Sequence, residues 1–290
     1  MILLFCPLYC YTKYGGDASN ELKMKIIRYG ADSQQYGQLY NPSIVNKKPV
    51  VIVIHGGYWK DNHSLDTYPT KYIVEYLLGF PVAVWNLEYR RMNTFGDNEV
   101  APYPAIFRDV MEGVDVLAQY ADSEMLDLNR VLIIGHSAGG HLATWAASRH
   151  LLPTSCELYR RKAQKVSGVI SIAGILDLWR ECDIEQPEQI IKLLGGTQQE
   201  FPKRYNLASP KALRPDDVDI TIVHGLKDDV VKFNQALSYC EGAGGNVSYI
   251  SIKGADHFGM LPITQSYTKG WQLVKSLIKQ KVVELTNMER

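Results

Sequence analysis

The stretch Val131-Leu132-Ile133-Ile134-Gly135-His136-Ser137-Ala138-Gly139 decides the fold of this chain. Its first four residues form a short, apolar, β-branched run typical of a buried strand, and residues 142–147 after it are typical of a helix. A serine between glycines at such a strand-to-helix turn is held with its hydroxyl exposed above the sheet. A Cβ at Gly135 or Gly139 would clash with the adjoining backbone, so small residues are needed there. The stretch predicts Ser137 as a nucleophile; an ordinary turn serine is the alternative.

Strand-like and helix-like stretches alternate on both sides of this turn. Strands are expected near 25–29, 35–40, 50–54, 82–87, 131–134, 166–173, 220–223 and 247–252, and helices near 67–78, 104–120, 232–241 and from 264 onward. The first two strands flank a turn at 30–33 and are expected to pair as an antiparallel hairpin. The alternation predicts an α/β fold with a mostly parallel sheet and helices on both faces.

The 290 residues contain no internal repeat, low-complexity segment or linker that would divide them into domains. Residues 24–290 are therefore predicted to form one domain. The polar and helical passage at about 177–209 is expected to be a small cap-like insertion over the carboxyl edge of the sheet. Residues 1–23 are expected to form a flexible extension, because ordered sequence starts near Met24.

The composition argues against several classes of partner. Apolar residues make up 46% and charged residues 21%, and the net charge is zero, so nothing favours binding to nucleic acid or to an anionic membrane. The five cysteines are odd in number and scattered, which argues against a disulfide framework or a structural zinc site. We expect a cytoplasmic protein that acts on a small-molecule substrate, and a homodimer is left open.

A serine hydroxyl is a weak nucleophile at neutral pH, so it needs a base that a carboxylate orients. The chain offers both groups on loops that follow predicted strands: Asp228 lies past the run 220–223, and His257 past the run 247–252. The chain order Ser137, Asp228, His257 is the serine–acid–histidine order of α/β-hydrolases. These three residues are predicted to form a catalytic triad.

Other acids and histidines lie close to the predicted triad. Asp229 adjoins Asp228, which is preferred because it comes three residues after the turn glycine Gly225. Asp256 directly precedes His257, so its side chain is expected to point elsewhere and to fix the loop. Four further histidines flank turn glycines and are expected to be satisfied by local hydrogen bonds: His55, His136, His141 and His224. No HExxH or comparable spacing occurs, which argues against a metal site.

The tetrahedral intermediate of acyl transfer needs hydrogen-bond donors for its oxyanion. The backbone N–H of Ala138, directly after the nucleophile, is expected to be one donor. The second is expected from His55-Gly56-Gly57-Tyr58-Trp59, which follows the strand at 50–54. Gly56 and Gly57 would let the main chain approach the substrate oxygen without a side chain in the way. A simple glycine turn is the alternative.

Two further groups of residues could line the pocket. Tyr58 and Trp59 are candidate substrate-binding residues, because their rings could stack on an aryl group, although aromatic rings there can equally be core packing. The run 86–91 closes a strand and ends in charged residues. Such a strand exit is more often solvated or paired, here with Asp109.

Three motifs resemble those of one known family. His55-Gly56-Gly57-Tyr58-Trp59 resembles the HGGxW signature of the kynurenine formamidase (arylformamidase) branch of the esterase/lipase-type α/β-hydrolases. The stretch 135–141 is similar to the GHSAGxH elbow of that group, and Asp256-His257-Phe258 is similar to its DHF motif. The likeness covers about residues 25–277. It implies an α/β-hydrolase fold and these roles: triad for Ser137, Asp228 and His257, and oxyanion hole for Gly56, Gly57 and Ala138.

The chain departs from this family at a few positions. Gly140 stands where several formamidases have alanine, and Gly259 follows the DHF motif where an acidic residue is often seen. The runs 86–91 and 126–131 look like those of the broader bacterial esterase-like relatives. These departures leave the triad intact and bear on the choice of substrate.

The motifs together predict a serine hydrolase that needs neither a metal nor a cofactor. Ser137 would attack an ester or N-formyl amide carbonyl, His257 would shuttle the proton, and water would release the acyl-enzyme. The resemblance implies N-formylkynurenine as the specific substrate. A carboxylesterase for small acyl esters is the alternative, and a non-catalytic ligand-binding homologue is disfavoured because all three triad members are present.

Overall fold

The computed structural model describes residues 23–41, 46–92, 103–262 and 268–288. The extension predicted over residues 1–23 lies outside the described residues, apart from Lys23 at the start of β1. The described chain forms one eight-stranded sheet in the order β1-β2-β4-β3-β5-β6-β7-β8. Strands β3 to β8 are parallel, and β1 and β2 pair antiparallel with each other and with β4. The prediction of an α/β fold with a mostly parallel sheet is confirmed.

The strands are β1 (Lys23–Arg28), β2 (Tyr36–Asn41), β3 (Lys48–Ile54), β4 (Ala83–Leu87), β5 (Leu126–His136), β6 (Gly168–Ile172), β7 (Asp219–Gly225) and β8 (Val247–Ile252). The helices are α1 (Lys71–Leu77), α2 (Ala105–Asp115), α3 (Ala138–Ser148), α4 (Glu188–Leu194), α5 (Pro202–Ala208), α6 (Asn234–Cys240) and α7 (Lys269–Asn287). Short 3-10 turns cover Val116–Tyr120, Arg149–Leu151, Glu181–Asp183 and Pro210–Leu213. No helix within these described ranges is both long and apolar enough to cross a bilayer.

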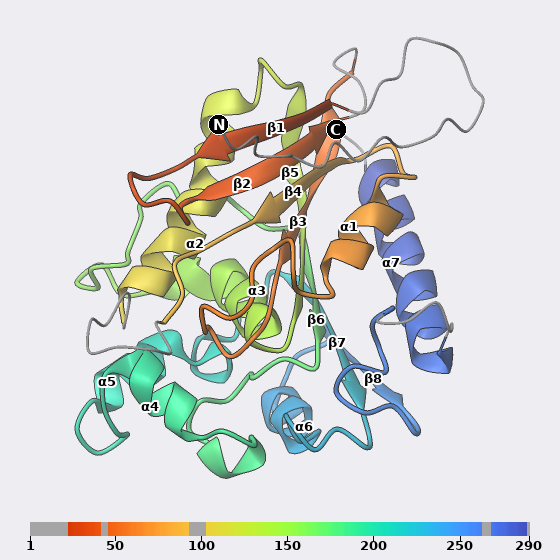
Figure 1. Cartoon of the computed structure of the whole chain (residues 1–290). Helices are drawn as coiled ribbons and strands as arrows, with labels where there is room; N and C mark the ends of the chain where they lie inside the picture. Colours follow the sequence, from red (N-terminus) through yellow and green to blue (C-terminus); the bar gives the residue numbers. More distant parts are fainter. Residues whose placement is uncertain (1–22, 42–45, 93–102, 263–267, 289–290) are drawn as a thin grey trace, which may run out of the picture.

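Helices cover both faces of the sheet, with α1 and α7 on one face and α2 and α3 on the other (Figure 1). Alternate side chains of β3 point to opposite faces of the sheet, and each face has its own core. Val50, Ile52 and Ile54 pack into the core shared with α2, α3 and α6, whereas Val51 and Val53 pack into the core shared with α1 and α7. Successive residues of a strand point to opposite faces, so a strand covered on both sides is apolar throughout.

The apolar residues of α2 recur at helical spacing and face the core. On α2, Ile106, Val110 and Val114 are fully buried. Asp109 of the same helix is also fully buried, and its carboxylate is paired with Arg90. Helix α1 begins at Lys71 and is shorter than the predicted 67–78. Pro69 interrupts that stretch, because the helical conformation is disfavoured for the residue that precedes a proline.

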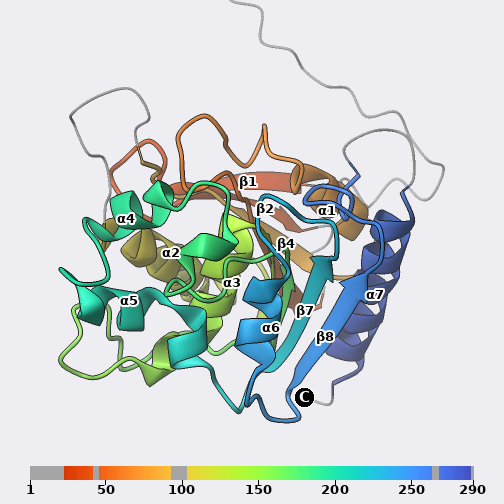
Figure 2. The ribbon, with the colours of Figure 1, turned by 90° about the horizontal axis from the view of Figure 1, so that it is seen from below.

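The segment predicted as a cap carries α4 and α5. Seen from below, these helices lie together on one side of the molecule, beyond α2 and α3 (Figure 2). Helix α6 lies beside β7 in the same view. The segment ends at Ser209, whose N–H donates to the carbonyl of Tyr205 at 2.9 Å.

The glycines at the strand-to-helix turn are required by close backbone packing. A Cβ on Gly139 would lie 2.2 Å from the carbonyl oxygen of Ile54 and 2.5 Å from that of His55. A Cβ on Gly135 would lie 2.1 Å from the carbonyl oxygen of Gly139. Backbone atoms cannot move aside as a flexible side chain can, so the clash predicted from the sequence is present at both positions.

Replacing Gly139 with alanine should therefore lower the free energy of unfolding by about 3 kcal/mol, because the added methyl forces β3 and α3 apart. Urea unfolding followed by circular dichroism measures this change. Gly245→Ala is the matched control, since a Cβ at Gly245 meets no atom within 4 Å. Equal unfolding midpoints for the two variants would contradict this account of the turn.

Candidate active site

Ser137 occupies the sharp turn between β5 and α3. Its backbone has φ 57° and ψ −123°, a conformation that non-glycine residues rarely adopt. Its N–H donates to the carbonyl of Ile172 at 2.9 Å, which ties the turn to the neighbouring strand β6. The side chain lines a cavity of about 210 Å³ together with His257. The turn thus brings a serine hydroxyl and an imidazole to one pocket.

Asp228 holds the imidazole of His257 from behind. Its Oδ2 lies 2.8 Å from Nδ1 of His257, and its Oδ1 accepts from the N–H groups of Val230 at 3.1 Å and Val231 at 2.8 Å. An ionised carboxylate accepts only, so Nδ1 of His257 carries the proton and Nε2 remains for the serine. The structure places Ser137, Asp228 and His257 at one site, as their chain order predicts.

The two rival acids lie elsewhere. Asp229 is exposed to solvent. The Oδ1 atom of Asp256 accepts from the N–H of Gly259 at 2.7 Å, which fixes the loop that carries His257. This is the loop-fixing role expected of Asp256 from its position in the sequence.

His224 makes a contact that the sequence did not reveal. Local hydrogen bonds were expected to satisfy it, but its Nε2 lies 3.2 Å from Oδ2 of Asp228 as well as 2.7 Å from the carbonyl of Val231. Both neighbours are acceptors, so Nε2 carries the proton. Burial acts to raise the pKa of Asp228, but hydrogen bonds from His224 and His257 outweigh it and hold that pKa well below the usual range. The carboxylate therefore stays ionised.

Hydrogen bonds of His136 join the turn that carries Ser137 to the loop that carries His257. His136 lies 2.8 Å from the hydroxyl of Tyr68 through Nδ1, and 2.9 Å from the carbonyl of His257 through Nε2. Burial lowers the pKa of His136 well below its usual value, so the ring is neutral. Its one proton must face the carbonyl, and Tyr68 then donates to Nδ1. Tyr68 also contacts Ser137 and lines the pocket, although the sequence analysis did not single it out.

The predicted oxyanion loop lies beside the nucleophile. A Cβ on Gly56 would lie 2.6 Å from the carbonyl oxygen of His136 and 2.6 Å from the hydroxyl of Tyr68, so only glycine fits there. Gly57 lines the pocket with φ +107°. No described residue accepts a hydrogen bond from the N–H of Gly57 or Ala138. Gly57 lines the pocket, and Ala138 directly follows Ser137, which also lines it.

The two aromatic residues after these glycines lie in different surroundings. Tyr58 lines the pocket, and its hydroxyl donates to the carbonyl of Val230 at 3.2 Å. Trp59 is fully buried, packs edge-on against His141 at 5.3 Å between ring centres, and is not among the described residues that line this pocket. The structure therefore supports pocket lining for Tyr58 and core packing for Trp59.

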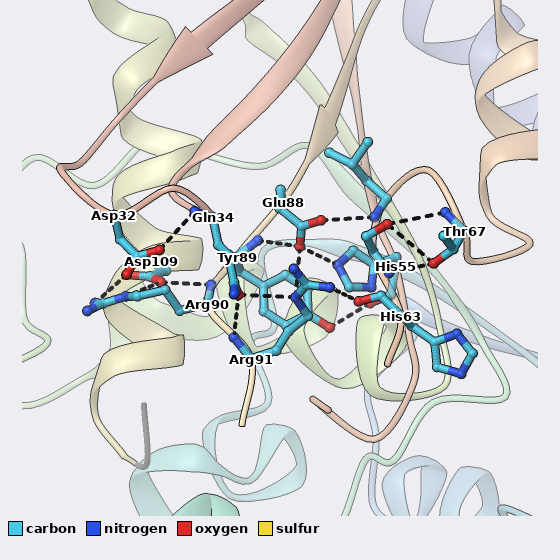
Figure 3. A network of polar contacts seen from close by, with 12 residues as sticks. Asp32, Gln34, His55, His63, Thr67, Glu88, Tyr89, Arg90, Arg91 and Asp109 are labelled. Atoms are coloured by element: carbon cyan, nitrogen blue, oxygen red, sulfur yellow. Dashed lines mark hydrogen bonds and ion pairs between the residues drawn. The ribbon is translucent and has the colours of Figure 1, made fainter. Parts of the chain in front are cut away.

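A buried carboxylate anchors the oxyanion loop (Figure 3). Glu88 follows β4 and accepts from Nε2 of His55 at 2.8 Å and from the N–H of Leu65 at 3.0 Å. Arg91 completes the network with an ion pair to Glu88 at 3.4 Å. Burial acts to raise the pKa of Glu88, but these partners outweigh it and lower the pKa overall. The charged strand exit thus supports the loops around the pocket.

The strand exit also forms the predicted ion pair with Asp109. Arg90 forms a two-pronged ion pair with Asp109, at 2.7 Å through Nη2 and 2.8 Å through Nε (Figure 3). Gln35 donates to the same carboxylate at 2.8 Å. Asp109 is fully buried, and these contacts join α2 to the residues just after β4 and just before β2.

The mouth of the pocket carries polar residues that the sequence analysis did not single out. Lys60 lies there beside Asn62 and His63, and Glu185 and Gln186 reach it from the segment predicted as a cap. These residues come from loops far apart in the chain, and no local pattern links them. In the part of the chain that the structure describes, no cluster of three or more histidine, cysteine or acidic side chains is placed to hold a metal ion.

Comparisons with known proteins identify similar enzymes. A family model described as BD-FAE matches residues 38–241 of the chain. The chain is 24% identical over 254 residues to a kynurenine formamidase of Drosophila melanogaster, which covers 82% of this chain and 75% of that protein. It is 26% identical over 263 residues to a kynurenine formamidase of Danio rerio, with 87% and 80% covered. These matches bear out the resemblance inferred from the motifs.

A solved structure shares the fold. The propionate-bound esterase Est2 of Thermogutta terrifontis superposes with a TM-score of 0.70 at 19% identity, over 94% of this chain and 97% of that one. A likeness at this identity speaks for the architecture alone. It agrees with the predicted α/β-hydrolase fold.

Proposed function

This chain belongs to the BD-FAE family and is a serine hydrolase of the α/β-hydrolase fold, and on that premise we propose that it hydrolyses N-formylkynurenine to kynurenine and formate. One observation carries the proposal: Ser137, His257 and Tyr58 line one cavity of about 210 Å³. This volume lies below the roughly 300–1,000 Å³ typical of pockets for drug-sized ligands. A one-carbon acyl group with an aromatic ring beside Tyr58 suits so small a space.

Each residue of the site has a distinct role in the proposed reaction. Nε2 of His257 removes the proton of Ser137 as its oxygen attacks the formyl carbon, while Asp228 stabilises the resulting imidazolium. The N–H groups of Gly57 and Ala138 bind the oxyanion. His257 then gives its proton to the leaving aryl amine.

Water completes the cycle. His257 takes a proton from a water molecule as its oxygen attacks the formyl-enzyme, and it then returns that proton to the oxygen of Ser137 as formate leaves. The low pKa of Asp228 keeps the carboxylate ionised throughout both half-reactions. No change of protonation at this carboxylate is needed.

The rest of the chain is proposed to serve this site. Residues 24–290 act as one hydrolase domain, and the segment 177–209 serves as a small cap, a role supported by Glu185 and Gln186 at the pocket. The scattered cysteines support a cytoplasmic location, and the neutral net charge supports a small-molecule substrate over nucleic acid or membrane. A homodimer remains the simplest oligomer to test.

A direct assay tests the substrate. Purified protein should release kynurenine from N-formylkynurenine with a kcat/KM at least about tenfold above that for p-nitrophenyl acetate, if the pocket recognises the aryl formamide. Turnover of the ester alone would refute the formamidase proposal and favour a carboxylesterase for small acyl esters. Absence of turnover with both, and of labelling by a fluorophosphonate, would favour a ligand-binding homologue.

A further inference from the structure

Two opposite charges stand at the mouth of the active-site pocket without pairing with each other. Lys60 and Glu185 both line this pocket together with Tyr58. We infer that they form a subsite for the zwitterionic head group of an aromatic α-amino acid, with Lys60 on its carboxylate and Glu185 on its ammonium. The inference rests on the proposed function and concerns the part of the substrate that is remote from the reacting carbonyl.

Lys60 is fixed in place but keeps its charge free. Its N–H donates to the carbonyl of Gly57 at 3.0 Å, which joins it to the oxyanion loop. Its Nζ donates to Oε1 of Gln186 at 2.7 Å and lies 5.9 Å from the centre of the Tyr58 ring. Among the described residues, no carboxylate lies within 4.0 Å of this ammonium. An ammonium has three donors, so two remain for a ligand carboxylate.

The backbone of Glu185 is also held in place. Its N–H donates to the carbonyl of Val230 at 2.8 Å, and the adjacent Ile184 pairs with Val231. Backbone pairing therefore fixes this segment against the loop that carries Asp228. The side chain is exposed, and within the described ranges no cation pairs with it.

The local charges support this arrangement. Burial and, after it, the charge of Glu185 raise the pKa of the Tyr58 hydroxyl. Burial and the charges of His55, Arg91 and Lys60 lower the pKa of His63, which keeps that neighbour neutral. The mouth thus presents one ammonium and one carboxylate, with a neutral imidazole and a neutral phenol beside them.

The chemistry of the substrate class matches these two charges. An α-amino acid carries its carboxylate and its ammonium on one carbon, so a cation and an anion placed together are complementary to it. Charge-assisted hydrogen bonds to both groups would bind the head group while the formamide reaches Ser137. A neutral acyl ester has no group that either side chain recognises.

Calorimetric titration tests the subsite apart from turnover. Kynurenine and 2-aminoacetophenone, which shares its aryl ketone but lacks the amino acid group, are titrated into the wild type, Lys60→Met and Glu185→Gln. Each variant should bind kynurenine about tenfold more weakly, the loss expected for one charge-assisted hydrogen bond. Binding of 2-aminoacetophenone should not change. Lys279→Met and Glu75→Gln, both away from the pocket, serve as matched controls.

The outcomes separate this inference from the proposed function. Equal kynurenine affinity in the wild type and both pocket variants would overturn the subsite, whatever the protein hydrolyses. Equal affinity of the wild type for the two ligands would overturn it as well. If kynurenine binding depends on both charges but N-formylkynurenine is not turned over, the subsite holds and the formamidase proposal fails.

Discussion

Replacement of Ser137 with alanine should lower kcat by about 10⁴- to 10⁶-fold, the range seen when the nucleophile of a triad is removed. Among the described residues that line the pocket, Ser137 is the only serine, and it lies at a turn with φ 57°. The pocket itself stays intact, because alanine keeps the Cβ. Binding of kynurenine should therefore change little.

Two measurements check this result. Hydrolysis is followed with N-formylkynurenine and p-nitrophenyl acetate, and covalent labelling by a fluorophosphonate is read by mass spectrometry. The control is Ser276→Ala on the exposed surface of α7, which should keep both activity and labelling. Substantial turnover by Ser137→Ala would rule out the acyl-enzyme route through this residue.

Replacement of Asp228 with asparagine should lower kcat by about 10⁴-fold, the loss measured when the triad acid of a serine protease is changed in this way. An amide cannot stabilise the imidazolium, and it favours the wrong tautomer of His257. His224 and His257 both contact Oδ2 of Asp228, at 3.2 Å and 2.8 Å. Both contacts need a hydrogen-bond acceptor at that atom. KM should change less than kcat.

The chain supplies a matched control one residue away. Asp229→Asn makes the same chemical change at an exposed position and should retain activity. The comparison is made by steady-state kinetics with both substrates at neutral pH, where Asp228 is ionised because its pKa is lowered. Similar losses in the two variants would show that the assignment of the acid is wrong.

Much of the fold follows from local sequence because buried strands are apolar without interruption. The run 50–54 is covered on both faces, and residues 131–134 run directly into the turn that holds Ser137. The meeting of the three triad residues could be predicted as well, because each follows a predicted parallel strand and such strands end at one edge of the sheet. Trp271, Val274 and Ile278 recur at helical spacing, and all three are buried on one side of α7.

The contacts that surround the triad could not be predicted from local sequence. His224 lies next to a turn glycine, and only the folded loop shows that it faces Asp228 four residues later. Tyr68 reaches His136 across 68 positions of the chain. Trp59 looked like a substrate-binding residue beside Tyr58, but adjacent residues on a turn point in different directions. Such contacts depend on how distant loops meet.

The backbone of Ser137 has a practical consequence for measuring this protein. A conformation with φ 57° and ψ −123° exists only while β5, α3 and the carbonyl of Ile172 hold it in place. A denatured chain has no reactive serine at this position. The fraction of molecules that take up a fluorophosphonate in a short exposure should therefore count the native molecules in a preparation, and would give the active concentration without reference to any substrate.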